Sequence, residues 1–399
     1  MPDASSREFD VVLWGATGFT GRLLAESFAE GAPAGLRWAL AGRDRARLED
    51  LRTVLGADAG IVVADASDAV GLDALARRTC VVLSTVGPYA RLGTPLVAAC
   101  VEAGSDYADI TGETLWMRSS IDAFHARARE TGSRVVHACG LDSVPSDLGL
   151  WLLQRAANHR HGRPCTHVEH VFGPMSGGIG GGTIASAFGV AASAAGDRRA
   201  RRALADHDLL APGAQPGPVA ADPWWPQWQP RLACWTAPFP MASVNTRVVR
   251  RSRALLGEPW GAETVYRERF RASHWPGALG IGVAAALVPI ALAWSPLRRF
   301  VARWLPAPGD GPDAAVLASG SFRSSLVGHV SDDEAPVIVE IESPYDPGYV
   351  STARMLRETG LAMALGEVSA AGGVHTPASV GAARLVERID AAGVRFTVV

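Results

Sequence analysis

The chain has 399 residues, of which 48% are hydrophobic and 20% are charged, and its formal net charge at pH 7 is -2. This length allows two globular domains, and the composition excludes an intrinsically disordered or fibrous protein. The charge balance gives no support for a nucleic-acid partner, because binding to a phosphate backbone requires a basic surface.

The first 150 residues contain short apolar runs that alternate with helical segments. Strands and helices that alternate at this spacing indicate βαβ units. We therefore predict an α/β fold, in which residues 1–150 form a first domain of Rossmann type with a doubly wound parallel sheet. The expected strands are residues 11–14, 38–41, 61–63, 81–85, 107–110 and 135–138, and the expected helices are residues 21–28, 45–55, 71–77, 95–103 and 121–130.

The first strand runs into a glycine turn, in the sequence FDVVLWGATGFTG at residues 9–21. Gly15 permits a tight turn, Gly18 lets the backbone approach a phosphate, and Gly21 lets the following helix lie close to the strand. The start of that helix offers free N–H groups and a positive dipole end to an anion. The turn predicts a dinucleotide site to which Thr17 and Phe19 also contribute. A glycine turn with a purely structural role is the alternative.

The residues after the second strand, Arg43 and Asp44, bear on the choice of nicotinamide cofactor. An arginine at this place pairs with the 2′-phosphate of NADP, whereas an acidic residue binds the 2′-hydroxyl of NAD. The arginine comes first, and Arg45 and Arg47 are near enough in the sequence to assist it. We therefore expect NADP, bound by Arg43, while Asp44 is also a candidate N-cap of the next helix.

The fourth strand is followed by the sequence STVGPY at residues 84–89. A turn at this edge of a Rossmann sheet lies beside the nicotinamide ribose, so Thr85, Gly87 and Pro88 are predicted to contact the cofactor. Tyr89 either faces the substrate or closes the loop.

Two further strand ends carry polar side chains beside the expected cleft. Residues 106–113 (DYADITGE) include Tyr107, and residues 137–147 (HACGLDSVPSD) include Asp142. Ligands of open α/β sheets bind outside the carboxyl ends of the strands, so Tyr89, Tyr107 and Asp142 are candidate catalytic residues. The alternative is local, because Asp and Ser are also common in turns and helix caps.

The regular alternation ends near residue 150, and residues 151–345 are predicted to form a second domain of α+β type that binds the substrate. Its strands near residues 319–330 and 336–342 indicate a mostly antiparallel sheet. The glycine-rich residues 176–183 favour a wide turn or a substrate-side loop over a second phosphate loop. Residues 346–399 are expected to form C-terminal helices that pack back on the Rossmann domain.

The second domain includes an apolar segment, residues 277–304. Its first part, Gly277 to Trp294, carries no charge and is interrupted by Pro289, while the second part carries arginines between apolar side chains. We expect a buried or interfacial helix in place of a membrane span. Such a segment suits long acyl chains, and it also suits peripheral contact with the inner face of the plasma membrane.

Residue types that are absent or scattered narrow the chemistry further. The chain has no lysine, which excludes Schiff-base chemistry and a lysine general base. Its five cysteines form no CxxC pair, so we expect no metal site and a reducing compartment. The first residues are polar and do not read as a signal peptide, so a cytoplasmic location is expected.

Several motifs together resemble the saccharopine dehydrogenase-like oxidoreductases. They are GATGFTG at 15–21, AGR at 41–43, STVGPY at 84–89, YADITGE at 107–113, CGLDSVPSDLG at 139–149, LPAPGDGP at 305–312 and GGVHTPA at 372–378. The chain looks most similar to the trans-acting enoyl reductase branch of mycobacterial lipid synthesis. This resemblance implies NADPH as cofactor and a fatty-acyl or polyketide intermediate, whose C=C bond is reduced in trans to a synthase.

Two other functions stay open at this stage. The chain could be an amino-acid-type dehydrogenase that acts on an imine, for which arginines facing the nicotinamide would be needed. It could also be a non-catalytic cofactor-binding protein at a lipid surface, for which residues 277–304 are the motivating feature. A homodimer is compatible with all three functions.

Overall fold

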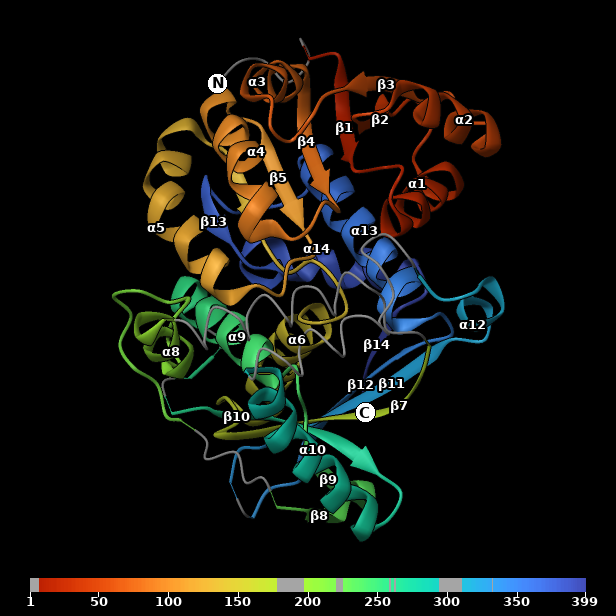
Figure 1. Cartoon of the computed structure of the whole chain (residues 1–399). Helices are drawn as coiled ribbons and strands as arrows, with labels where there is room; N and C mark the ends of the chain where they lie inside the picture. Colours follow the sequence, from red (N-terminus) through yellow and green to blue (C-terminus); the bar gives the residue numbers. More distant parts are fainter. Residues whose placement is uncertain are drawn as a thin grey trace.

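The computed structural model describes residues 7–177, 197–219, 225–257, 260–261, 263–293, 311–331 and 333–399. These residues form two units, each built around a seven-stranded sheet, with the parallel sheet above the mixed sheet in Figure 1. Residues 178–196 contain most of the predicted glycine-rich turn, and residues 294–310 contain the arginine-bearing part of the apolar segment. Those predictions fall outside the described residues.

The first sheet has the strand order β13-β6-β5-β4-β1-β2-β3, and all its pairs are parallel. The predicted doubly wound fold is confirmed, with all six expected strands present. The strands are β1 (Phe9–Trp14), β2 (Trp38–Gly42), β3 (Gly60–Val63), β4 (Thr79–Ser84), β5 (Asp106–Asp109), β6 (Arg134–Val136) and β13 (Gly373–His375). The helices are α1 (Phe19–Gly31), α2 (Arg45–Leu55), α3 (Ala69–Arg78), α4 (Tyr89–Ala103), α5 (Thr114–Thr131), α13 (Thr352–Ala364) and α14 (Pro377–Ala391).

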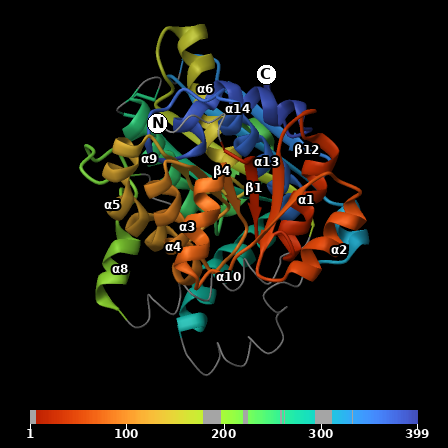
Figure 2. The same cartoon turned by 90° about the horizontal axis from the view of Figure 1, so that it is seen from above.

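Strand β1 is apolar along its length because helices cover both faces of this sheet. Val11 and Leu13 join the core formed with α1, α2 and α13, whereas Val12 and Trp14 join the core formed with α3, α4 and α5. Figure 2 shows α3, α4 and α5 together on one side of the strands and α13 on the other. This double coverage explains why a continuous apolar run predicted the strand.

Helix α4 begins six residues earlier than the sequence predicts. The backbone N–H groups of Tyr89 and Ala90 both donate to the carboxylate of Glu113, at 2.9 Å each. The Glu113 carboxylate, which comes from a different loop, thus accepts hydrogen bonds from free N–H groups in the first turn of α4. Pro95 lies within this helix. A cap supplied by a residue so far along the chain leaves no local signal in the sequence.

The second sheet has the strand order β14-β12-β11-β7-β10-β9-β8 and is mostly antiparallel, as predicted, with one parallel pair between β7 and β10. Its strands are β7 (His167–Ser176), β8 (Gln227–Gln229), β9 (Cys234–Pro238), β10 (Val265–Ala272), β11 (Ser321–His329), β12 (Val337–Ser343) and β14 (Arg395–Val398). Its helices are α6 (Val144–His161), α8 (Arg198–Ala205), α9 (Ala242–Leu256), α10 (Trp275–Ala293) and α12 (Ala314–Ala318).

Helix α6 joins the two units, because it leaves the edge of the first sheet and packs on one face of the second. A Cβ added at Gly149 would lie 2.8 Å from Ile341 Cδ1 and 2.9 Å from Leu326 Cδ1. The glycine therefore lets the helix approach β11 and β12 closely. Since α6 runs across residue 150, the domain boundary placed there stays a prediction.

The C-terminal residues contribute to both sheets, which the sequence did not predict. Helix α13 packs on α1 and on β4, and β13 then adds an edge strand beside β6. After α14 the chain returns to the second unit, where β14 pairs with β12. Both strands are too short to be predicted from their own sequence pattern, and they are recognised only by the strand with which each one pairs.

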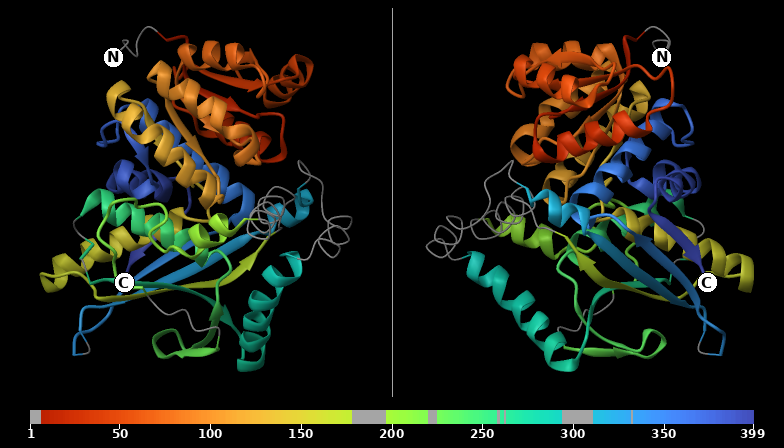
Figure 3. Two further views of the ribbon diagram at one scale, coloured as in Figure 1. Left: turned by 60° about the vertical axis from the view of Figure 1, so that its left-hand side comes forward. Right: turned by 90° about the vertical axis from the view of Figure 1, so that its right-hand side faces the viewer.

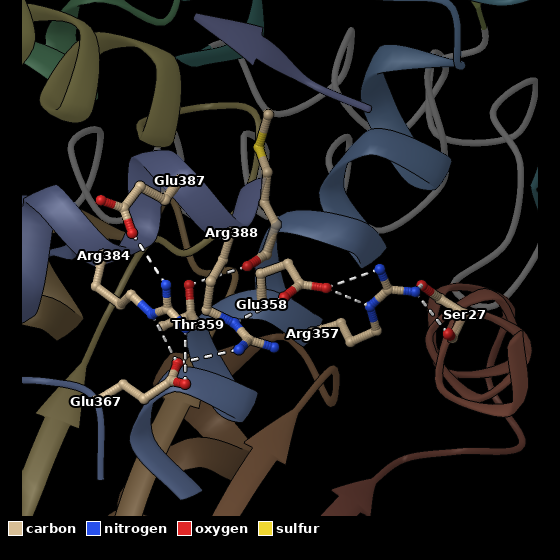
Figure 4. A network of polar contacts seen from close by, with 9 residues as sticks. Ser27, Arg357, Glu358, Thr359, Glu367, Arg384, Glu387 and Arg388 are labelled. Atoms are coloured by element: carbon tan, nitrogen blue, oxygen red, sulfur yellow. Dashed lines mark hydrogen bonds and ion pairs between the residues drawn. The ribbon is translucent and has the colours of Figure 1, made fainter. Parts of the chain in front are cut away.

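An ion-pair network fixes these C-terminal helices (Figure 4). The buried Glu358 pairs with Arg357 at 2.7 Å and with Arg388 of α14 at 2.9 Å. Arg357 also donates to the backbone oxygen of Ser27 in α1, at 2.7 Å, and Arg388 reaches Glu367 at 3.0 Å. The network ties α13 to α1 on one side and to α14 on the other.

Helix α10 covers most of the predicted apolar segment and stands at the edge of the molecule in both views of Figure 3. Ala278 is buried against Ala237 and Ala272, but Val283 is 41% exposed and Leu287 is 57% exposed. Of the two expected alternatives, a buried or an interfacial helix, the buried one therefore does not hold for this face. Across the described ranges, no helix is long and apolar enough to cross a membrane.

Candidate active site

The candidate site lies at the carboxyl edge of the parallel sheet, where the strand order reverses between β1 and β4. A crevice opens at such a reversal because the connections from the two strands run in opposite directions. The structure brings most of the predicted site residues to this edge. They are Gly15, Thr17, Gly18, Phe19 and Gly21 after β1, Arg43 after β2, Thr85, Gly87 and Pro88 after β4, and Asp142 after β6.

The glycines of the β1–α1 turn are required by close packing. Gly15 has φ of +88°, and a Cβ there would collide with the side chain of Val86 and approach Thr85 Oγ1 to 3.1 Å. A Cβ at Gly21 would collide with the backbone of Gly15. Only glycine fits at either position, so the turn brings bare backbone to the crevice.

The N-terminus of α1 is free to bind an anion. Its N-cap residue is Gly18, which offers no side-chain cap, and its first turn carries no acidic residue. The first N–H groups of a helix have no partner within the helix, and they carry partial positive charge. The ring of Phe19 packs edge-on against Tyr349 at 4.8 Å. The glycine cradle and the uncapped helix fit a pyrophosphate.

Arg43 is exposed directly after β2 and has no ion-pair partner within the described residues. Its neighbour Asp44 is the N-cap of α2 and accepts a hydrogen bond from Arg47 N at 3.2 Å. The structure therefore assigns Asp44 the capping role. Arg45 and Arg47 pair with Glu49 and Asp44, both at 3.6 Å, so Arg43 is the arginine here that is available to a phosphate group.

The turn after β4 braces the glycine turn. Thr85 donates from its backbone N–H to Trp14 O at 3.1 Å, and its hydroxyl lies 3.3 Å from the same oxygen. Gly87 is exposed and Pro88 is the N-cap of α4. This turn therefore lies beside the β1–α1 turn, as expected for residues that flank a bound dinucleotide.

The structure corrects the candidate tyrosines. Tyr89 is 5% exposed, stacks on Trp116 at 5.4 Å and donates its hydroxyl to Ser84 O at 3.0 Å. Tyr107 is fully buried in the same core. Burial raises the pKa of both phenols well above the usual value, which makes them poor proton donors as well. Neither side chain reaches the crevice, because both point into the core under α4 and α5.

The carboxylates of residues 106–113 also serve the fold. Asp106 pairs with Arg134 at the opposite end of β5, and Glu113 caps α4. The buried Asp109 lies 2.8 Å from His137 Nδ1, and His137 Nε2 lies 2.9 Å from Ser120 Oγ.

This Ser–His–Asp arrangement resembles a hydrolytic triad, but it has no room for a substrate. The cavity beside His137 holds only about 10 Å³, enough for one water molecule. We therefore assign these three side chains to the core. The part of the chain that the structure describes also contains no cluster of His, Cys, Asp or Glu that could hold a metal, and all five cysteines are free.

Asp142 is the candidate that remains at the crevice. Its carboxylate lies 3.9 Å from the point where a Cβ at Gly112 would sit, and Met241 Cε lies 3.8 Å from the same point. The side chain is half-buried between the turns after β5 and β6 and the start of α9. Burial raises the pKa of Asp142 to about 6, and no neighbouring charge contributes. A carboxyl group in such a place can hold a proton near neutral pH.

A buried chain of hydrogen bonds runs from the residue after Asp142 into the second unit. Ser143 donates to Asn245 Oδ1 at 3.2 Å, and Asn245 donates to Glu268 Oε2 at 2.9 Å. Tyr266 donates to the other oxygen of Glu268 at 2.8 Å and lies 3.2 Å from His170 Nδ1. Asn245, Glu268 and His170 were not predicted from the sequence. Their hydrogen-bond partners lie on other helices and strands, so no local pattern identifies them.

Asp147, in the first turn of α6, links this helix to the GGVHTPA motif. Its Oδ2 accepts a hydrogen bond from Ala378 N at 2.8 Å. Burial raises the pKa of Asp147 to about 7, against the opposing effect of hydrogen bonds from Ser252, Ala378 and Thr376. The role of this carboxylate is therefore to join two segments far apart in the sequence.

Comparison with known proteins adds to this geometry. Residues 11–136 match the family described as the saccharopine dehydrogenase NADP binding domain. Mycobacterium bovis has a protein named trans-acting enoyl reductase that is 38% identical, over 98% of this chain and 97% of its own length. A Mycobacterium tuberculosis protein that provisionally carries the same name is 44% identical, over 98% of this chain and 97% of its own length.

Among solved structures, apo saccharopine dehydrogenase (L-Glu forming) from Saccharomyces cerevisiae has a similar fold. The TM-score is 0.53, and the match covers 98% of this chain and 99% of that one. The sequence identity is 14%, so this likeness concerns the fold alone.

Proposed function

The chain belongs to the family of saccharopine dehydrogenase-like oxidoreductases that includes the mycobacterial trans-acting enoyl reductases, and we propose that it reduces the C=C bond of an enoyl thioester in trans to a synthase. These matches confirm the resemblance that the sequence motifs indicated. The protein is an NADP-dependent oxidoreductase, and NADPH supplies a hydride when it is bound. The substrate and the roles of individual residues are our proposal.

The cofactor is proposed to lie across the crevice at the reversal of strand order. Gly15, Gly18 and Gly21 would hold the pyrophosphate against the start of α1, with Thr17 and Phe19 in the same turn. Arg43 would pair with the 2′-phosphate, and Thr85, Gly87 and Pro88 would flank the nicotinamide ribose. Two observations support this placement of the cofactor. The turn has room only for glycine at Gly15 and Gly21, and Arg43 has no ion-pair partner among the described residues.

Asp142 is proposed as the proton donor, and the main support for this role is its position after β6, at the carboxyl edge of the parallel sheet. Hydride addition at the β-carbon of an enoyl thioester leaves an enolate, which needs a proton at the α-carbon. The raised pKa of Asp142 keeps part of the carboxyl groups protonated near neutral pH. A neutral carboxyl at the crevice can hydrogen-bond to the enolate oxygen and then release its proton to the substrate.

The surroundings of Asp142 favour an acyl substrate over an amino acid. Met241 Cε and the Asp142 carboxylate lie 3.8 Å and 3.9 Å from the same point beside Gly112, and Phe239, which precedes Met241 in the chain, stacks on Phe172 at 4.2 Å. An amino-acid substrate carries a carboxylate that needs a cationic partner nearby. No described arginine contributes to the pKa of Asp142, whose shift has burial as its cause. The apolar surroundings suit an acyl chain.

Peripheral contact with a lipid surface is a secondary proposal, motivated by the exposed Val283 and Leu287 of α10. Sedimentation with anionic vesicles tests it. If wild-type protein and a Val283→Ser/Leu287→Ser variant sediment equally, α10 is not the contact. A homodimer is tested by sedimentation velocity of the purified chain.

A substrate comparison tests the main proposal. NADPH oxidation is followed with crotonyl and longer enoyl thioesters, and separately with a 2-oxo acid plus an amine. We expect oxidation with the enoyl thioesters and conversion to the saturated acyl product, identified by mass spectrometry. Oxidation with the oxo acid and amine alone would instead support an imine-reducing dehydrogenase.

A further inference from the structure

Helix α8 (Arg198–Ala205) presents an arginine face to solvent. Its sequence is RRARRALA, and none of its residues is buried. At about 3.6 residues per turn, the four arginines fall within roughly half of the helix circumference, and Ala200, Ala203 and Leu204 lie on the other half. The whole chain has a net charge of -2, so this concentration of positive charge is a local feature. In Figures 1 and 2, α8 lies at the periphery of the molecule beside α5.

Three of the four arginines of this face form no ion pair with a described carboxylate. They are Arg198, Arg199 and Arg202. The acidic residues around the helix have other partners. Asp197 caps α8 and accepts a hydrogen bond from Arg199 N at 2.8 Å, while Asp208 pairs with Arg250 at 2.7 Å. The guanidinium groups of these three arginines are therefore available to an external anion.

A buried arginine holds α8 in place. Arg247 of α9 is 5% exposed, and its guanidinium donates to Leu204 O, to Ser243 O and, at 3.1 Å, to Asp206 O. Two of these acceptors belong to the end of α8 and the residue that follows it. A helix whose end is held in this way presents its charges in a defined arrangement, so binding of a partner would cost little conformational entropy for ordering the helix.

The segment after α8 is anchored on the first unit. Leu209 and Leu210 are buried in its core, and Arg118 of α5 donates to Leu209 O at 3.0 Å. Helix α9, which carries Arg247, begins directly after Met241, the residue that contacts the turn beside Asp142. The arginine face is thus connected to the candidate active site through one helix.

We propose that α8 is the docking site for an acidic carrier domain that delivers the enoyl thioester, an inference that rests on the proposed function. An enzyme that acts in trans must recognise the protein on which its substrate is carried. A convex face of arginines suits an acidic protein surface better than a small ligand, because it encloses no cavity. Charge complementarity of this kind accelerates association and fixes the orientation of the partner.

A second basic area provides a matched control. Arg271, Arg323 and Arg395 line an open pocket of about 850 Å³ at one end of the second sheet. Arg323 is paired with Glu342 at 2.7 Å, while Arg271 and Arg395 are exposed and have no ion pair among the described residues. A double charge reversal here changes the net charge of the protein by the same amount as a double reversal in α8.

The experiment compares Arg198→Glu/Arg202→Glu with Arg271→Glu/Arg395→Glu. The probe is a fluorescently labelled acyl carrier protein of acidic pI, whose binding is measured by anisotropy at several salt concentrations. We expect wild-type affinity to fall as salt rises, the α8 variant to bind about tenfold more weakly, and the control variant to bind like wild type. Unchanged binding by the α8 variant, or a larger loss in the control variant, would overturn the proposal. NADPH titration of both variants checks that they are folded.

Turnover distinguishes this inference from the proposed function. With crotonyl-loaded carrier protein, kcat/KM of the α8 variant should fall about tenfold, whereas the rate with crotonyl N-acetylcysteamine should stay at the wild-type value. An equal loss with both substrates would contradict a docking role. If neither substrate is reduced by wild-type protein, the proposed function fails, and the anisotropy result still decides whether α8 binds the carrier.

Discussion

The hydroxyl oxygen of Thr352 accepts a hydrogen bond of 3.1 Å from the backbone N–H of Leu141. Leu141 directly precedes Asp142, and Thr352 is the first residue of α13. A Cβ added at Gly140 would come within 2.9 Å of Thr352 Cγ2, so the two segments are also in close contact. The C-terminal helix therefore supports the turn that carries the proposed proton donor.

Removal of this support should affect turnover more than cofactor binding. In Thr352→Val the N–H of Leu141 loses its acceptor, so we expect a loss of about 1–2 kcal/mol in unfolding free energy and a lower kcat. Affinity for NADPH should stay the same, because the Thr352 hydroxyl bonds to Leu141 and Pro347 and not to the glycine turn. Thr352→Ser, which keeps the hydroxyl, is the control. A valine variant with wild-type kcat would show that the turn keeps its geometry without this bond.

Arg43 should determine the preference for NADPH over NADH. Arg43→Ala loses a charge-assisted contact to the 2′-phosphate, so we expect NADPH affinity to fall by about 1.5–3 kcal/mol, with NADH affinity nearly unchanged. Fluorescence titration with both cofactors measures this. Arg52→Ala, in the last turn of α2, is the control. Equal affinity of the wild-type protein for the two cofactors would refute the role of Arg43.

Gly15 should tolerate no side chain, for reasons of packing and not of backbone conformation alone. Gly15 and Gly35 have nearly the same φ, +88° and +84°, but a Cβ at Gly35 meets nothing within 4 Å. Gly35→Ala should therefore cost only the strain of its positive φ, about 1 kcal/mol. Gly15→Ala should cost more in thermal stability and should also abolish NADPH binding. Similar behaviour of the two variants would contradict the close packing against Val86.

Asp142 should be needed for catalysis in its protonated form. Because its pKa is raised to about 6, the acid form predominates below that pH and is lost as the pH rises through it. We expect kcat/KM to decline above about pH 6 and Asp142→Asn to lose activity by a factor of about 100 or more while it still binds NADPH. Stopped-flow measurement across the pH range tests this. An Asn variant with the wild-type rate and pH profile would exclude Asp142 as the donor.

Asp147 should make folding stability depend on pH. Its carboxyl is protonated in the native state up to about pH 7, whereas in the unfolded chain it ionises near pH 4. The native state therefore binds more protons between these values, so unfolding free energy should fall as the pH rises from about 4 to 7, by on the order of 3 kcal/mol. Asp147→Asn keeps an acceptor for Ala378 N and should flatten this dependence in urea titrations. An unchanged slope would mean that other groups cause it.

The sequence was sufficient to predict the nucleotide-binding fold, because the motifs that indicate it are local. The glycine turn, its strand and its helix lie within residues 9–31, and Gly18 and Gly21 approach the backbone of Gly15 within that same turn. The close contact of Gly15 with Val86, by contrast, comes from elsewhere in the chain. Alternating apolar runs likewise predicted the six strands of the first 150 residues. The capping role of Asp44 could be read in the same way, since it depends only on the next three residues.

Only the tertiary structure separated the three candidate catalytic residues. Tyr89, Tyr107 and Asp142 all follow or lie in strands that end at the same edge, yet both tyrosines are buried in the core whereas Asp142 is only half-buried. The residues that support Asp142 come from far away in the sequence, as the contacts of Ser143 with Asn245 and of Leu141 with Thr352 show. Burial and pairing across such separations depend on how the helices and sheets pack, because no residue near Asp142 in the sequence supplies them.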